Sequence, residues 1–239
     1  MSSKKSLAYN MNQIITALSS IKDRQLRVYG AITLYLATRS GEIMPYRHYH
    51  YKYELNTEGK VMKAISNDGE STYASKRVVL STQDSPGIDV ATISVYKNRI
   101  EFVVPVFKCK KKVEEKAYIY SKGNPFFVEI QNYILERQAR RKVIGKPVYL
   151  FEATDCDVEK YFHNFKKRFI RALQKQLPGA KVHSLRKTMA TYAAIISGGN
   201  IFFVKGVTRH RKLETLNEYV APIQLQKQFE EYLGVEDNL

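Results

Sequence analysis

The residues best suited to chemistry lie between positions 182 and 220, in VHSLRKTMATYAAIISGGNIFFVKGVTRHRKLETLNEYV. This stretch contains His183, Arg186 one helical turn later, His210, and Tyr219 nine positions after His210. Cations can hold and neutralise a phosphate, an imidazole can move protons, and a tyrosine can attack as a nucleophile. These residue types therefore suit cleavage of a phosphodiester by a phenol, without a metal.

The charge of the chain indicates a polyanionic partner. Lys and Arg number 39 against 23 acidic residues, for a formal net charge of +16. Such a balance favours binding to a nucleic acid, with an anionic membrane surface as the second possibility. At 239 residues and 44% hydrophobic composition, the chain is large enough for one generous domain or two small ones with a well-buried core.

The membrane alternative finds no support in the sequence. No window approaches the roughly 18 uninterrupted apolar residues of a membrane span, and the start, MSSKKSLAYNMNQ, lacks a signal-peptide core. We expect a soluble, intracellular protein that is associated with DNA.

Neither cysteine nor histidine spacing indicates a metal or a disulfide framework. The two cysteines, Cys109 and Cys156, are too few and too far apart. His48 and His50 would share one face of a strand, but no third ligand is evident nearby, so a solvated, tyrosine-rich strand is the better interpretation. We expect no metal and no cofactor.

The N-terminal part is expected to be helical. Residues 2–19 suit a leader or one short helix. Ser19 or Ser20 can cap the next helix, which has an apolar stripe and ends near Ser40 and Gly41. The stripe consists of Ile21, Val28, Ile32, Tyr35 and Leu36. Arg39 is thereby placed at the end of a buried helix.

Strand patterns dominate the middle of the chain. Residues 44–88 read as a β-rich insertion or an elaborated loop. Three antiparallel strands are predicted from ATISVY, RIEFVVPVFK and EKAYIYS, with the basic run 108–112 at a hairpin. Pro105 indicates an edge strand or a bulge.

The rest of the chain is predicted to be helical again. PFFVEIQNYILERQARR is one helix, and Asp155 or Asp157 can cap a second, which ends at Pro178 and Gly179. Ser184 can cap the helix of HSLRKTMATYAAIIS, and glycines 198 and 199 end it. The predicted fold class is α+β, mainly α, with a small three-stranded antiparallel sheet.

Together these residues resemble the catalytic core of tyrosine recombinases, the phage-integrase type. The family pattern is His-x-x-Arg, a Gly-His or a variant of it, and a tyrosine nine residues beyond that histidine. Here the pattern falls on His183 with Arg186, on His210 and on Tyr219. The usual Leu-Gly-His is replaced by Thr208, Arg209 and His210.

Two further family boxes have counterparts. The segment ATRSGEI is similar to the family box that carries the first arginine, which implies a catalytic role for Arg39. The family's lysine lies in a β-hairpin, so FKCKKK points to Lys108, with Lys110 as the second choice. The resemblance spans residues 20 to about 232.

The resemblance implies a domain plan. Residues 20–239 would be the catalytic domain, and 222–233 could dock on a neighbouring protomer or equally fold back in cis. Nothing long enough to be the family's N-terminal core-binding domain precedes residue 20, so we expect that domain to be absent. The implied partners are double-stranded DNA and further copies of the chain, as a tetramer on DNA.

The resemblance also implies an activity: site-specific DNA recombination or integration through a 3'-phosphotyrosyl intermediate, without ATP or metal. One alternative is DNA relaxation of the type IB topoisomerase kind, although those enzymes usually carry a lysine where His183 stands. The other is a DNA-binding protein that keeps the fold without the chemistry.

Overall fold

The computed structural model describes most of the chain, namely residues 8–58, 63–65, 72–75, 77–85, 87–106, 113–152, 157–210, 212–222 and 224. Its helices are α1 (Met11–Ser19), α2 (Arg24–Tyr35), α3 (Ser40–Ile43), α4 (Phe127–Ile144), α5 (Val158–Gln174), α6 (Val182–Ile196) and α7 (Ile201–Thr208). Short 3-10 turns are η1 (Val90–Thr92) and η2 (Leu213–Leu216), and residues 217–222 continue as helix after η2. The expected mainly helical α+β fold is confirmed.

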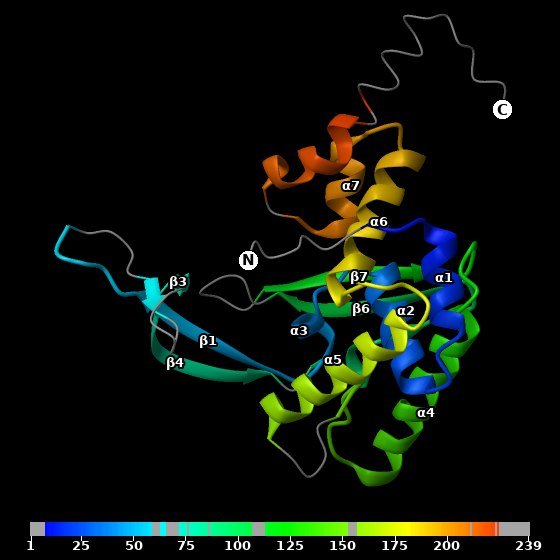
Figure 1. Cartoon of the computed structure of the whole chain (residues 1–239). Coiled ribbons are helices and arrows are strands. Elements are labelled where there is room, and N and C mark those ends of the chain that lie inside the picture. The colour runs from blue at the N-terminus through cyan, green and yellow to red at the C-terminus, as the bar shows by residue number, and fades with distance from the viewer. Residues whose placement is uncertain are drawn as a thin grey trace, which may run out of the picture.

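Helix α2 is the centre of the helical body. It contacts α1, α4, α5 and α6, and Figure 1 shows it surrounded by these helices. Tyr29 of α2 is fully buried and makes edge-to-face contacts with three phenylalanine rings at centroid distances of 5.0 to 5.6 Å, those of Phe151, Phe165 and Phe169. Aromatic packing around α2 thus fixes the end of this helix, where Arg39 follows.

The three-stranded sheet was also predicted correctly. It consists of β5 (Ser94–Val95), β6 (Arg99–Val106) and β7 (Val113–Tyr120), in the antiparallel order β5-β6-β7. Ile100, Phe102 and Val104 alternate into the core and are fully buried. Strand β5 pairs with residues 100 and 101 of β6, so within the described part of the chain no strand pairs with β6 on that side at Pro105.

Residues 46–85 form antiparallel strand pairs. Strand β1 (Tyr46–Tyr53) pairs with β4 (Arg77–Ser85), and β2 (Lys63–Ile65) pairs with β3 (Thr72–Ser75). The β1–β4 ribbon extends away from the helical body in Figure 1. At its base, Arg47 binds Asp84 at 2.8 Å and Asp157 at 2.9 Å, which ties the ribbon to the start of α5.

Two helix starts differ from the sequence prediction. Helix α2 is capped by Asp23, which accepts from the Leu26 N–H, because Ser19 and Ser20 belong to the end of α1. Helix α6 begins at Val182, before the predicted Ser184 cap. For α5, of the two candidate caps, Asp157 is the one that accepts from the first turn.

Helix α1 lies in the segment that we treated as a leader or short helix. Its Ile14, Ala17 and Leu18 are buried in the same core as α2. The helix therefore shares the core of the domain that we placed at 20–239.

Replacing Gly30 should destabilise the fold. A Cβ at Gly30→Ala would lie 2.4 Å from Leu18 Cδ2 and 2.8 Å from Phe169 Cε2, so we expect a loss of about 1–3 kcal/mol in the free energy of unfolding by urea denaturation. Gly206→Ala is the control, because a Cβ there meets nothing within 4 Å, and it should be neutral or stabilising by up to about 1 kcal/mol. An equal loss in the free energy of unfolding in both variants would contradict the close packing around Gly30.

Candidate active site

The buried side chain of Arg186 joins three separate parts of the chain. It projects from α6 and is only 1% exposed. Its Nη1 donates to the carbonyl of Ala37 after α2, and its Nη2 donates to the carbonyl of Thr208, the last residue of α7, at 2.6 Å. One guanidinium thus fixes the ends of α2 and α7 against α6.

The turn after α2 presents Arg39 beside Arg186. Ala37 has a left-handed backbone (φ 47°), and Arg39 follows as the N-cap of α3. Arg39 Nη1 donates to Glu42 Oε1 at 2.9 Å, and its backbone N–H donates to Oε2 at 3.0 Å. The side chain of Arg39 remains 30% exposed, whereas that of Arg186 is buried.

Two positive charges lie close together here. Burial and then the charge of Arg39 lower the pKa of Arg186 to about 10, while Glu42 raises it. Arg186 therefore remains charged at neutral pH, and the paired guanidinium groups suit a doubly contacted anion such as a phosphate.

His210 has a defined ring orientation. Its Nδ1 lies 2.6 Å from Thr208 Oγ1, and that hydroxyl donates its only proton to the Val204 carbonyl at 2.7 Å. The hydroxyl must therefore accept from Nδ1–H, which places the proton of a neutral ring on Nδ1. The other ring nitrogen, Nε2, lies 3.3 Å from Arg186 Nη2.

His183 lies in the first turn of α6, and its side chain is exposed. Desolvation by the surrounding protein, followed by the charges of Arg186, Lys187 and Arg39, lowers its pKa below the ordinary 6.5. The ring is therefore neutral at pH 7 and able to accept a proton.

Tyr219 lies on the helical residues after η2. It packs against a small apolar cluster between α6 and α7 that consists of Ala193, Ala194, Val204, Leu216 and Val220. Burial and the neighbouring Glu218 carboxylate raise the pKa of its phenol, while Arg186 lowers it. The phenol is therefore protonated at neutral pH and needs a base to become a nucleophile.

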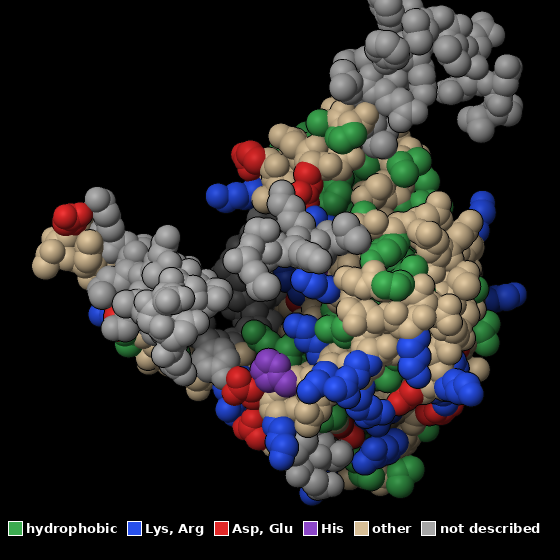
Figure 2. Space-filling model, in the orientation of Figure 1, with side chains coloured by type: hydrophobic (Ala, Val, Ile, Leu, Met, Phe, Trp, Pro, Cys, Tyr) green, Lys and Arg blue, Asp and Glu red, His purple; other side chains and the backbone are tan. Residues whose placement is uncertain are grey.

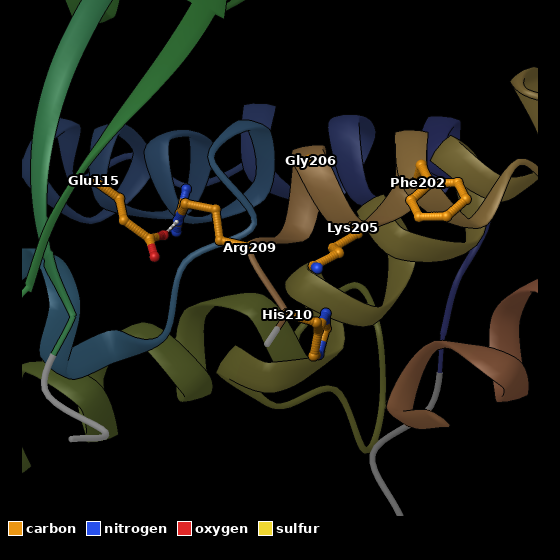
Figure 3. A pocket seen from close by; sticks show the side chains of 6 residues that line it. All are labelled: Glu115, Phe202, Lys205, Gly206, Arg209 and His210. Atoms are coloured by element: carbon orange, nitrogen blue, oxygen red, sulfur yellow. Dashed lines mark ion pairs between the residues drawn. The ribbon is translucent and has the colours of Figure 1, made fainter. Parts of the chain in front are cut away.

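A small cavity opens beside His210 (Figure 3). It has a volume of about 470 Å³ and is lined by Glu115, Phe202, Lys205, Gly206, Arg209 and His210. On one face of the molecule, Lys and Arg side chains also gather over α5 (Figure 2). The exposed basic residues of α5 are Lys160, Lys167, Arg168 and Arg171.

The structure places four of the predicted site residues around the guanidinium of a fifth, Arg186. Arg39, His183, His210 and Tyr219 each interact with Arg186 directly or through its charge. Lys108 and Lys110 lie outside the described residues, so the choice between them stays a prediction.

Sequence reasoning overlooked the residues that hold these groups. Glu42 lies within the ATRSGE box and could have been singled out from that resemblance. Thr208 and Arg209 carry no sequence signal for their contacts. Lys187, whose ammonium lies 3.7 Å from Glu218, looks like one more basic residue among 39.

The described residues hold no cluster of three or more His, Cys, Asp or Glu side chains that could bind a metal ion. No helix within the described ranges is both long and apolar enough to cross a membrane. His48 and His50 lie in β1, where their side chains are not described.

No protein-family model and no curated protein matches the chain. Several solved structures match the chain. XerH site-specific recombinase, bound to palindromic difH substrate in a post-cleavage complex, matches with a TM-score of 0.57 at 13% identity. XerA recombinase matches with a TM-score of 0.56 at 14% identity, over 95% of this chain.

The chain has the fold of tyrosine recombinases. The XerH match covers 97% of this chain and 54% of XerH, so the chain spans about half the length of that recombinase. A transposon integrase, that of Tn1549 in complex with transposon right end DNA, matches with a TM-score of 0.50 over 98% of this chain and 68% of the integrase. The tyrosine-recombinase fold that the sequence motifs implied is thereby confirmed.

The pKa of His183 provides a direct test of the site's positive field. We expect an NMR titration to give a value below 6.5, and Lys187→Met to raise it, because the variant removes one neighbouring cation. Because His183 binds a proton more readily in the unfolded chain than in the folded one, its protonation should lower the free energy of unfolding as the pH falls below about 6.5. Lys175→Met, a change at an exposed lysine beyond α5, is the control. A His183 pKa at or above 6.5 in the unmodified protein would contradict the cationic surroundings described for this ring.

Proposed function

We propose that this chain cleaves and rejoins double-stranded DNA as a site-specific recombinase or integrase, with Tyr219 as the nucleophile. The observation that carries the proposal is the grouping of Arg39, His183, His210 and Tyr219 around the buried Arg186. The formal charge of +16 and the exposed cations of α5 support a DNA partner.

The proposed step is an exchange of one phosphate ester for another. The Tyr219 oxygen bonds to the phosphorus, and the bond from phosphorus to the 5'-oxygen breaks. The phenolic proton passes to His183, whose lowered pKa leaves it neutral at pH 7, and the departing 5'-oxygen takes a proton from Lys108. The DNA 3' end is then joined to the protein, and the reverse attack by a 5'-hydroxyl rejoins a strand.

The two arginines would stabilise the charge that builds on the phosphate oxygens. Arg39 approaches from the exposed side and Arg186 from the buried side of the site. His210 would donate to the phosphate through Nε2–H in its doubly protonated form, since its Nδ1–H is directed to Thr208. Removal of one such donor typically costs about 10²- to 10³-fold in rate.

Strand exchange requires a second duplex and further copies of the chain. We propose that the protein acts as a homo-oligomer on DNA, a tetramer in a complete recombination complex, inside the cell that holds the DNA. The segment 222–233, which would dock on a neighbour or fold back in cis, lies largely outside the described residues.

Two alternatives have distinct signatures. A type IB topoisomerase activity would relax supercoiled DNA without exchanging strands between duplexes. A DNA-binding protein without the chemistry would bind in a salt-sensitive manner and form no covalent adduct.

A nicked suicide substrate tests the proposal. When the nick lies just downstream of the cleavage site, the short fragment with the free 5'-hydroxyl diffuses away after cleavage, so a covalent protein–DNA adduct should accumulate. Tyr219→Phe should abolish the adduct while DNA binding is retained. Tyr192→Phe, at an exposed tyrosine of α6, should form adduct at the unmodified rate. Adduct formation by the Tyr219→Phe variant would contradict the assignment.

The catalytic lysine can be assigned with a sulfur-substituted substrate. Lys108→Ala should slow adduct formation on an ordinary nicked duplex by about 10²- to 10⁴-fold, as expected for loss of a general acid. A duplex with a 5'-bridging sulfur should restore the rate, because a thiolate leaves without a proton. Lys110→Ala is the comparison variant. If Lys110→Ala shows the loss and the rescue while Lys108→Ala does not, the assignment moves to Lys110.

A further inference from the structure

Arg209 adopts an unusual backbone conformation immediately before His210. It has a φ of 53°, in the left-handed region that disfavours residues with a Cβ. Among the described residues, only Ala37 and Arg209 are non-glycine residues with positive φ. Both contribute to the site, and strained backbone is retained where surrounding contacts hold it.

The side chain of Arg209 is directed into the protein. Its Nη1 donates to the Leu36 carbonyl at 2.8 Å, its Nη2 lies 3.2 Å from Glu42 Oε2, and its Nε lies 3.7 Å from Glu115 Oε2. Figure 3 shows the pairing with Glu115 at the edge of the cavity that His210 also lines. With 8% of the side chain exposed, these contacts direct the guanidinium of Arg209 to acceptors within the protein.

Glu42 links Arg209 to Arg39. The carboxylate is nearly buried, its Oε1 accepts from Arg39 Nη1 at 2.9 Å, and its Oε2 pairs with Arg209. Oε2 accepts from Arg209 Nη2 at 3.2 Å and from the Arg39 backbone N–H at 3.0 Å, so the side chain of Arg39 meets the carboxylate through Nη1 alone. Without Arg209, the guanidinium of Arg39 could turn to take both carboxylate oxygens and direct its donors away from a phosphate.

We propose that Arg209 is a positioning residue: it holds Arg39 through Glu42, and it holds His210 through the left-handed turn that the contact with Leu36 fixes. This inference rests on the proposed DNA cleavage. Arg209 thus stabilises the transition state without touching DNA, by keeping two phosphate-binding groups in one geometry.

Arg209→Gly isolates the side chain, because glycine adopts a φ of 53° readily. Single-turnover adduct formation at saturating nicked duplex should slow by about 10²-fold, the scale of a misplaced catalytic group. The dissociation constant for DNA should change less than about threefold, since the side chain is buried. Arg209→Lys, which keeps the charge but lacks the forked donors, should restore part of the rate.

A double-mutant cycle with Glu42→Gln separates positioning from general structural damage. If Arg209 acts through Glu42, the double variant should be no slower than the slower single variant. The inference would be overturned if the double variant lost rate by the product of the two single losses. It would also be overturned if Arg209→Gly or Arg209→Lys formed adduct at the rate of the unmodified protein. If Arg209→Gly does not melt cooperatively, the same two outcomes are judged from Arg209→Lys and its cycle with Glu42→Gln. An unmodified protein that forms no adduct would refute the proposed function instead.

Discussion

The constraint on which the site depends is the burial of the Arg186 cation. Removing a guanidinium from water is costly unless its donors find acceptors. Nη1 and Nη2 of Arg186 find them in the carbonyls of Ala37 and Thr208, which lie just after α2 and at the last residue of α7. Carbonyls at helix C-termini carry partial negative charge, so they compensate the cation only in part. The charge of Arg186 therefore still acts on the ionisable groups around it.

The field of that charge contributes to the protonation states of the neighbouring groups. His183, near Arg186, Lys187 and Arg39, has a lowered pKa and stays neutral, as a proton acceptor must. The phenol of Tyr219 is protonated because burial and Glu218 outweigh the opposite effect of Arg186. A bound phosphate would bring negative charge close to both groups, while a base such as His183 takes the phenolic proton. In the proposed reaction these charges would be in place before the substrate arrives, as electrostatic preorganisation of phosphoryl transfer requires.

The sequence allowed the prediction of the elements and of the residues that cluster around Arg186, because both leave local patterns. Ile100, Phe102 and Val104 alternate along one strand, and Phe162, Phe165 and Phe169 recur at helical spacing along α5. The supporting contacts leave no local pattern in the sequence, since Arg209 and Leu36 are 173 positions apart and Arg186 and Ala37 are 149 positions apart. The shift of the α6 start from Ser184 to Val182 has a local cause: the Ser184 hydroxyl accepts from the Lys181 N–H, so a capping residue type occupies the third helical position.

The sheet has a positional role that follows from the same contacts. Strand β6 is fixed to the core by its buried alternate residues, and in its pairing with β7, Val104 lies opposite Glu115. Glu115 pairs with Arg209, one residue before His210. The base of the β6–β7 hairpin is therefore held next to the site by an ion pair, and the basic run that begins at Lys108 follows β6 by two residues. If the lysine of this run is the proposed general acid, a strand pair anchored at this point would supply it from outside the helical core.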